Sequence, residues 1–266
     1  MTECVSIAIE NRIARVTLNR PDKHNAVDLA MFEALGEAGR QIATDTSIRA
    51  VVLEGAGSNF CAGIDTSLFQ GGESVVGPDS MAPRGGSPAN LFQLAAYVWR
   101  EVPVPVICSI AGIAYGAGLQ IALGADIRFA RPDARFSVME IKWGLIPDMA
   151  ISTTLTRCMP ADRIKELACT GRVFDGAEAC ELGLVTALHD DPSQHALDTA
   201  QRIAARSPDA VRAIKHLFDK AWNIPDRDAL KLEASLQSTL LGGANQVEAV
   251  MANIEDRPPD FSDPEA

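Results

Sequence analysis

The chain has 266 residues, of which 47% are hydrophobic and 5% aromatic, and its formal net charge at pH 7 is -11. This composition can bury a sizeable core built of Val, Ile, Leu and Ala, so it excludes wholesale disorder. The acidic balance and the lack of a long basic run disfavour nucleic-acid binding as the main function, although backbone dipoles and a few basic side chains still allow an anionic ligand.

Neither the N-terminal sequence nor any apolar run predicts a targeting or membrane-spanning segment. The most apolar stretch, residues 104–125, is interrupted by Pro, several Gly and Gln120. The six cysteines form no C-x-x-C pair, and the four histidines lack metal-ligand spacing. We therefore expect a cytoplasmic protein with reduced thiols, no metal site and no membrane partner.

The first part of the chain predicts strands and helices in alternation. Residues 6–21 alternate as a β-hairpin, residues 28–43 have a helical apolar period, and residues 49–57 form a short buried strand. Residues 71–88 are rich in Gly, Pro and Ser. They predict a mobile surface loop, either a passive insertion or a lid that lines a pocket.

The middle of the chain repeats the order of strand, turn and helix, which predicts a layered α/β fold. Strands are expected at residues 104–112, 125–130 and 135–141, and helices at residues 90–100, 115–124, 151–158 and 161–170. Asp175 is the expected N-cap of a further short helix that leads into a strand.

Strand signals end near residue 192. Residues 1–192 therefore predict the α/β core, and residues 193–266 predict a helical segment that packs on this core or on a neighbouring subunit. The last residues, 255–266, are rich in Pro and Asp and are expected to fray.

Two short segments place small residues where a strand leads into a turn or helix. They are FCAGID at residues 60–65 and YGAGLQ at residues 115–120. Backbone N–H groups from two such turns, aimed at one point, would form an oxyanion hole. Either segment alone is more often a device for tight packing. The G-x-G-x-x-G and P-loop patterns are absent.

A third segment, residues 136–148, carries Glu140 and Asp148 in an otherwise apolar run. A buried carboxylate is costly unless it is paired or neutralised. These acids therefore either face solvent or belong to a site that uses them.

Together these segments resemble the crotonase (enoyl-CoA hydratase/isomerase) superfamily over most of the chain. The matching residues are Asn19-Arg20-Pro21, Asn25-Ala26, and residues 60–65, 111–118, 125–127, 136–147 and 181–185. The resemblance implies a spiral of repeated β-β-α units with C-terminal helices that form trimers, often paired as hexamers. It implies an acyl-CoA thioester of fatty-acid metabolism as substrate. Coenzyme A is then part of the substrate, and no separate cofactor is expected.

The resemblance also assigns residues. By position, the two oxyanion-hole amides map onto Ala62 and Ala117. The backbone that meets the CoA moiety maps onto Ala62, Gly63, Ile64 and Asp65, with Gly116 beside Ala117. Lys23 and His24 fall in the loop that approaches CoA, where they either touch phosphate or are simply solvated.

The carboxylates indicate the reaction. In the hydratases of this superfamily two glutamates activate one water, at the positions of Gln120 and Glu140. A carboxamide does not exchange protons usefully at neutral pH. Simple enoyl-CoA isomerases use one base at the Glu140 position. Asp148 matches an Asp of the dienoyl-CoA isomerases, which also have an Asp at the Gln120 position. The alternative role of Asp148 is that of a helix N-cap.

We therefore predict an enzyme that moves the double bond of an enoyl- or dienoyl-CoA. Glu140 is its base, and Asp148 and Gln120 lie in the catalytic site. One alternative is an enoyl-CoA hydratase, slow because of Gln120. Another is a non-catalytic acyl-CoA-binding subunit.

Overall fold

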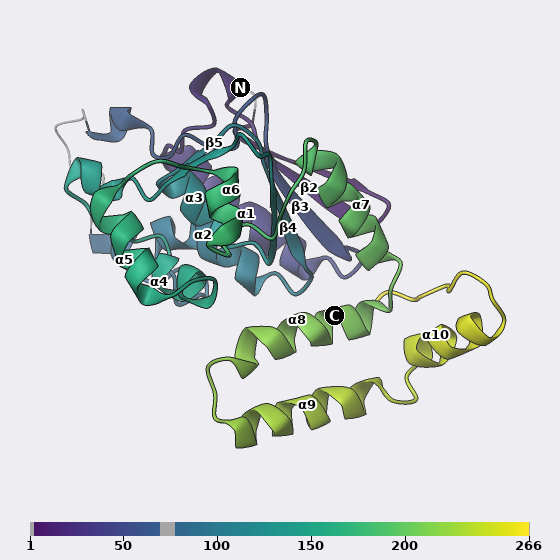
Figure 1. Ribbon diagram of the computed structural model, residues 1–266. Helices are drawn as coiled ribbons and strands as arrows, with labels where there is room; N and C mark the ends of the chain where they lie inside the picture. The colour runs from purple at the N-terminus through teal and green to yellow at the C-terminus, as the bar shows by residue number, and fades with distance from the viewer. Residues whose placement is uncertain (1–2, 70–77, 266) are drawn as a thin grey trace.

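The protein is built on two β-sheets flanked by helices (Figure 1). The structure is a computed structural model, and it describes residues 3–69 and 78–265. The larger sheet has six strands in the order β1-β2-β3-β4-β6-β9, and the smaller one has the order β5-β7-β8. The strands are β1 (Val5–Glu10), β2 (Ile13–Leu18), β3 (Ala50–Gly55), β4 (Val106–Ile110), β5 (Ile113–Tyr115), β6 (Ile127–Ala130), β7 (Arg135–Ser137), β8 (Phe174–Asp175) and β9 (Ala187–Leu188). Strands β1 and β2 pair antiparallel, which confirms the predicted hairpin, and the later pairs of the larger sheet are parallel.

Helices follow most of these strands. They are α1 (Leu29–Thr44), α2 (Leu91–Glu101), α3 (Ala117–Leu123), α4 (Ile151–Thr154), α5 (Ala161–Thr170), α6 (Gly176–Glu181), α7 (Pro192–Ala204), α8 (Pro208–Ala221), α9 (Asp226–Leu240) and α10 (Ala244–Ile254). Asp28, Asn90 and Asp175 cap α1, α2 and α6, each by accepting a backbone N–H of the first turn. The cap predicted at Asp175 is thus confirmed, and so is the mixed α/β architecture.

Alternate side chains of β3 enter apolar clusters on opposite faces of the sheet, so the sheet is covered on both faces. Val51 and Leu53 point into the main core, which also contains the apolar faces of α1, α2 and α3. Ala50 and Val52 point the other way, into a smaller cluster with apolar residues of α7. A strand buried on both faces reads as a continuous apolar run, as β3 does.

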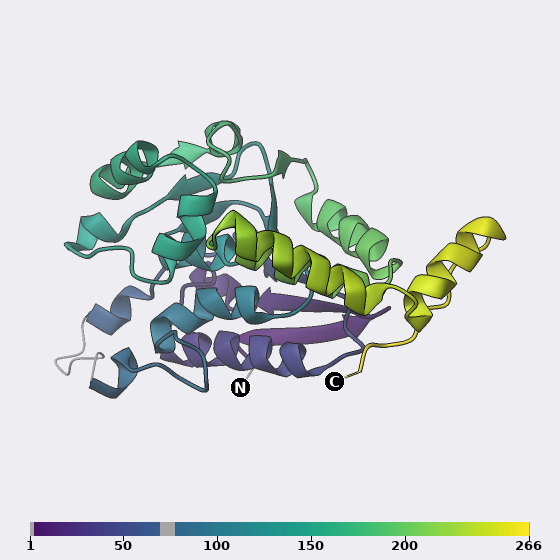
Figure 2. The same cartoon turned by 90° about the horizontal axis from the view of Figure 1, so that it is seen from below.

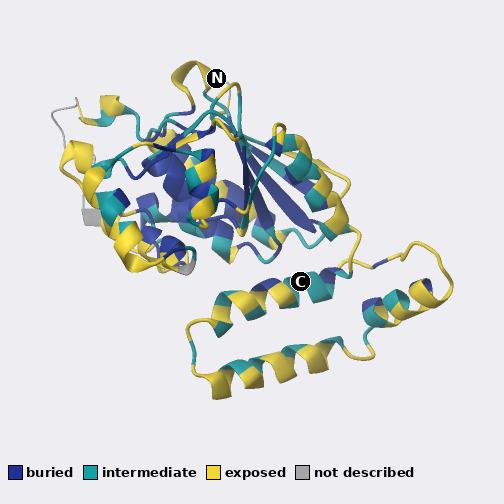
Figure 3. Cartoon of the chain, in the orientation of Figure 1, coloured by how far each residue is buried: buried dark blue, intermediate teal, exposed yellow. Residues whose placement is uncertain are grey.

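The C-terminal helices divide into one that lies on the core and three that stand away from it. Helix α7 packs across β3, β4 and β6. Helices α8 and α9 pack against each other, and together with α10 they extend from the core (Figures 1 and 2). Figure 3 shows that α9 and α10 are mostly exposed and that α8 is mostly half-buried, in contrast with the buried strands. The domain boundary at residue 192 and the oligomeric role of residues 193–266 stay predictions.

Two predicted elements differ from those observed. The strand expected at residues 135–141 ends at Ser137, and residues 140–143 form a 3-10 helix, η4 (Glu140–Trp143). The reason is that β8 pairs with this strand only as far as Phe136 and β5 only as far as Ser137, so the ladder has no partner beyond Ser137. The helix expected at residues 151–158 is split into α4 and a 3-10 turn at Leu155–Arg157.

The C-terminal tail, predicted to fray over residues 255–266, does not fray in the part that the structure describes, residues 255–265. Phe261 is only 7% exposed, and its carbonyl accepts a hydrogen bond from Arg49 at 2.8 Å. The Ser262 N–H donates to Asn245 Oδ1 at 2.9 Å. These contacts hold the tail against α10 and the core. Residues 71–77 of the predicted loop lie outside the described residues, and the rest of it begins with a 3-10 turn at Pro78–Met81.

Candidate active site

A cavity of about 130 Å³ opens where the three segments singled out in the sequence meet. One side consists of residues 62–69, another is the start of α3, and the third consists of residues 139–149. Its lining includes the predicted site residues Ala62, Gly63, Ile64, Gly116, Ala117, Gln120, Glu140 and Asp148. The structure therefore brings together most of the residues predicted for catalysis and substrate binding.

The first two segments are joined by backbone hydrogen bonds. The Cys61 N–H donates to the Ile113 carbonyl at 2.9 Å, and the Tyr115 N–H donates to the Cys61 carbonyl at 3.1 Å. Gly63 has a φ of +98°, and a Cβ at this position would lie 2.8 Å from the Tyr115 oxygen. Glycine is required here because its conformation and the close approach of β5 both exclude a side chain. The same virtual Cβ would lie 3.8 Å from the Ala117 nitrogen, so this turn and the start of α3 are neighbours.

The amide of Ala62 is already occupied, which contradicts its predicted place in an oxyanion hole. Its N–H donates to the His24 carbonyl at 2.9 Å. Ile64, two residues later, forms a parallel bridge with Val27. The hydrogen bonds of this bridge run from the Val27 N–H to the Gly63 carbonyl and from the Asp65 N–H to the Val27 carbonyl. In an extended chain the Ile64 amide therefore points away from Val27.

The Ile64 and Ala117 amides are free donors beside the cavity. Ala117 is the first residue of α3, and a first-turn N–H has no partner within its own helix. Neither amide donates a hydrogen bond to any residue in the part of the chain that the structure describes. Both residues line the cavity. Two free donors at one cavity wall are what an oxyanion hole requires.

Gln120 holds Glu140 in a fixed orientation. The Met149 N–H donates to Gln120 Oε1 at 2.8 Å, so the amide nitrogen of Gln120 must face the other way. That nitrogen, Nε2, donates to Glu140 Oε1 at 2.6 Å. Gln120 is 1% exposed, and a buried amide with both ends paired has little freedom to reorient. It acts as a hydrogen-bond donor toward Glu140.

The second oxygen of Glu140 is buried and unpaired. Oε2 has no hydrogen-bond partner among the described residues. Burial raises the pKa of the Glu140 carboxyl, the charge of Asp148 raises it further, and the hydrogen bond from Gln120 opposes this rise. Burial also raises the pKa of Asp148. A carboxyl whose pKa is moved toward neutrality can both accept and return a proton.

The lack of a side chain at Gly116 leaves space for the carboxylate of Glu140. A Cβ on Gly116 would lie 3.2 Å from Glu140 Oε1, and the residue has a φ of +49° and a ψ of -117°. This region of backbone conformation is essentially restricted to glycine. The turn before α3 and the glutamate are therefore packed in direct contact.

The remaining predicted residues, Asp65, Lys23 and His24, do not line the cavity. Asp65 accepts a hydrogen bond from Arg20 at 3.1 Å, and hydrogen bonds from Ser67 and Arg20 lower its pKa. The His24 ring contacts Asn59 Nδ2 at 3.0 Å, and Lys23 is exposed. Their roles toward CoA stay predictions.

Asn25 is a positioning residue to which the sequence assigned no role. It is completely buried, and its Nδ2 donates to the carbonyls of Ala56, Asn59 and Phe60. Its Oδ1 accepts the Arg20 N–H at 2.9 Å. Asn25 thus fixes the chain that leads into the turn at residues 61–64. Its place in the matching motif was the one signal available.

The cavity has an apolar wall. It includes Phe69, Met139, Trp143, Leu145, Ile146 and Met149. Most of these residues lie in the apolar run that carries Glu140 and Asp148, so the run itself was a signal. Phe69 gave none, because its neighbours in sequence show no periodic pattern.

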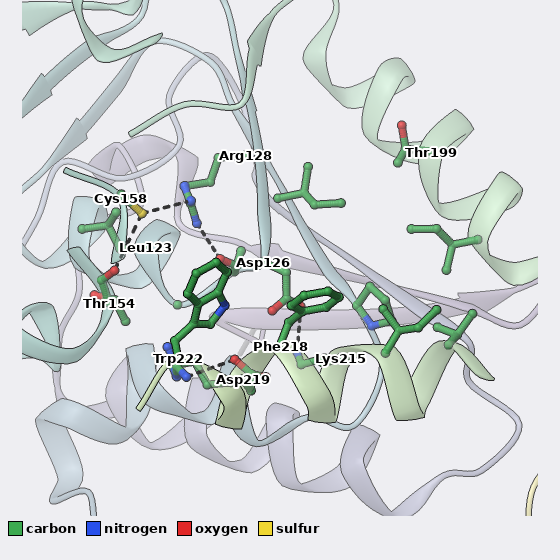
Figure 4. A pocket seen from close by; sticks show the side chains of 18 of the residues that line it. Leu123, Asp126, Arg128, Thr154, Cys158, Thr199, Lys215, Phe218, Asp219 and Trp222 are labelled. Carbon is green, nitrogen blue, oxygen red and sulfur yellow. Dashed lines mark hydrogen bonds and ion pairs between the residues drawn. The ribbon is translucent and has the colours of Figure 1, made fainter. Parts of the chain in front are cut away.

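A second and larger cavity, of about 770 Å³, separates α8 from the core. Figure 4 shows the rings of Phe218 and Trp222 at this cavity. Lys215 Nζ donates to Asp126 at 2.7 Å and to the carbonyls of Trp99 at 3.0 Å and Val104 at 3.1 Å, so all three donors of this buried ammonium have partners. The ion pair anchors α8 to the core.

Comparisons with known proteins agree with this arrangement. The model of the enoyl-CoA hydratase/isomerase family matches residues 8–264. The chain is 33% identical to 1,2-epoxyphenylacetyl-CoA isomerase of Escherichia coli K12, over 98% of this chain and 99% of that protein. It is 32% identical to enoyl-CoA hydratase EchA19 of Mycobacterium tuberculosis H37Rv, over 92% of this chain and 91% of that protein.

Solved structures give the same result. A putative enoyl-CoA hydratase from Streptomyces coelicolor A3(2) superposes with a TM-score of 0.88 and 29% identity, covering 97% of this chain and 94% of that one. An enoyl-CoA hydratase from Bacillus anthracis superposes with a TM-score of 0.87 and 27% identity, covering 97% of this chain and 98% of that one. The chain belongs to the enoyl-CoA hydratase/isomerase family and has the crotonase fold, as its sequence motifs predicted.

Two further findings concern the described residues alone. None of their helices is long and apolar enough to cross a membrane. They contain no cluster of three or more His, Cys, Asp or Glu side chains that could hold a metal ion.

Proposed function

We propose that this acyl-CoA enzyme moves the double bond of an enoyl- or dienoyl-CoA, with Glu140 as the group that transfers the proton. The proposal rests on the hydrogen bonding and burial of the two carboxylate oxygens of Glu140. One oxygen is held by Gln120, and the other is buried, unpaired and at the cavity beside two free amides. This arrangement supports a single proton-transfer group next to an oxyanion hole.

The proposed reaction begins at the thioester carbonyl. The N–H groups of Ile64 and Ala117 donate to its oxygen and make the protons on C2 more acidic. Glu140 Oε2 removes one of these protons, and the negative charge spreads over a dienolate whose oxygen the two amides stabilise. Glu140, or Asp148 beside it, then returns the proton to C4. The double bond moves from C3–C4 to C2–C3, no atom is gained or lost, and the step requires no resident cofactor.

Hydration of the double bond is the second candidate, because several relatives bear the name enoyl-CoA hydratase. Water addition in two-carboxylate sites needs a second group that exchanges protons. Here that position is held by Gln120, whose oxygen already accepts the Met149 N–H. A carboxamide fixed in this way can orient Glu140 but cannot take a proton from water. The geometry therefore favours isomerisation.

The test compares 3-enoyl-, 3,5-dienoyl- and 2-enoyl-CoA substrates by ultraviolet absorbance. We expect isomerisation of a 3-enoyl- or dienoyl-CoA to fall by about 10²- to 10⁴-fold in Glu140→Gln. Glu37→Gln, the same change at an exposed position of α1, should leave the rate unchanged. Fast hydration with no isomerisation would refute the proposal in favour of a hydratase. Binding without any turnover would indicate a non-catalytic acyl-CoA-binding subunit.

We also propose that α8, α9 and α10 associate with other copies of the chain to form a trimer. Large apolar side chains on these helices are exposed to water, including Trp222 at 73%, Leu230 at 63% and Ile254 at 73%. Such a surface is costly in a monomer and is typical of an interface. Light scattering should give three times the chain mass of 28.4 kDa, or six times if trimers pair. A monomer at micromolar concentration would contradict this proposal.

A further inference from the structure

Two aromatic side chains form part of the wall of the acyl cavity. Phe69 ends the 3-10 turn η2 (Thr66–Phe69), and Trp143 ends η4. Their ring centroids lie 5.4 Å apart with the planes tilted by 31°. Both line the cavity, yet Phe69 is 44% and Trp143 46% exposed. An apolar surface left open at a cavity gains free energy when an apolar ligand covers it.

Trp143 lies one turn from Glu140 on the same 3-10 helix. Side chains at positions i and i+3 of such a helix project on the same side, and the rise of about 2.0 Å per residue separates them by roughly 6 Å along its axis. The part of an acyl group just beyond the carbon that meets Glu140 must therefore pass the indole ring. The tryptophan is placed to contact the acyl group within a few bonds of the thioester.

The size of the cavity limits that acyl group. A volume of about 130 Å³ is close to the roughly 150 Å³ of an apolar protein cavity that binds one benzene molecule. A long linear chain would not fit in this space and would extend beyond it into water, and Ile146, one of the lining residues, is 76% exposed. The thioethers of Met139 and Met149, which also line the cavity, suit contact with an aromatic edge.

We infer that the acyl group ends in a single six-membered ring close to the thioester, and that Phe69 and Trp143 select this ring over a linear chain of equal carbon number. The inference rests on the function proposed above. A substrate with this chemistry is cyclohex-1-enylacetyl-CoA. Its C2 proton would leave to Glu140 and return to the ring carbon C4, while the double bond moves out of the ring to C2–C3.

Binding tests the inference without turnover. Phenylacetyl-CoA and octanoyl-CoA have the same number of acyl carbons and no double bond to move. Titration calorimetry of the wild-type protein should show phenylacetyl-CoA binding about three- to tenfold tighter, the range expected for favourable ring contacts. Trp143→Leu should remove this preference, and Trp143→Phe should keep most of it. Ile141→Ala, a change on the same 3-10 helix at a residue outside the cavity lining, should leave the preference unchanged.

Each outcome decides between the two proposals. Octanoyl-CoA binding as tightly as phenylacetyl-CoA, or a preference that survives in Trp143→Leu, would overturn the ring inference while leaving an acyl-CoA site in place. Binding of neither thioester would refute the proposed function itself. As a second measurement, kcat/KM for cyclohex-1-enylacetyl-CoA should exceed that for 3-octenoyl-CoA. The reverse order would also overturn the inference.

Discussion

Replacing Gln120 with glutamate should give this site a second acid–base group. The new carboxylate would occupy the place of the present amide, whose nitrogen lies 2.6 Å from Glu140 Oε1. The Met149 N–H could still donate to it, because the oxygen that accepts this bond is kept. The change therefore exchanges a fixed donor for a group that titrates, with little change in shape.

The separation between the two pKa values follows from the distance between the groups at positions 120 and 140. Two unit charges 2.6 Å apart repel by about 6 kcal/mol at an effective dielectric constant of about 20. At 1.36 kcal/mol per pKa unit this separates the two titrations by roughly four to five units, so the pair holds one shared proton at neutral pH. One carboxylate could then accept a proton from water while the other carboxyl donates one.

We expect hydration of crotonyl-CoA, measured as loss of the absorbance of the conjugated thioester, to rise by about 10²- to 10⁴-fold in Gln120→Glu. The double variant Gln120→Glu with Glu140→Gln keeps one carboxylate and one amide in contact and should show no gain. A single variant that binds acyl-CoA normally but hydrates no faster than the wild-type protein would refute the view that Gln120 is what limits hydration.

Three other changes test the site. The isomerisation rate should fall at acidic pH, because Glu140 must be deprotonated to act as the base. The midpoint of the pH–rate profile should lie above 4.5, the ordinary pKa of a glutamate, because the pKa of Glu140 is raised. Asp148→Asn removes a charge that raises this pKa and should therefore move the midpoint down. Gly116→Ala should lower the free energy of unfolding by about 1–3 kcal/mol in urea titrations, since the backbone conformation at position 116 is strained for alanine. It should also reduce kcat, because the new methyl group would press on Glu140. An unchanged kcat would contradict this contact. Asn25→Ala should cost about 2–4 kcal/mol in the same titrations because it leaves buried carbonyls unpaired, and a loss below 1 kcal/mol would show that water replaces the amide.

The sequence by itself determined the family, the α/β layering and the residue types at the site. Periodic apolar runs predicted β3 and α1, and an acid in an apolar run singled out Glu140 and Asp148. These features are local, because the spacing of apolar residues and the chemistry of a side chain can be read without knowing what lies opposite.

The tertiary structure decided how those groups are used. Ala62 and Ile64 both lie in the small-residue turn, but only contacts with the distant residues His24 and Val27 leave the amide of Ile64 free. The direction in which Gln120 donates is set in the same way by the Met149 N–H. The partner of a backbone group depends on which segments the fold brings together, and no local pattern records that choice.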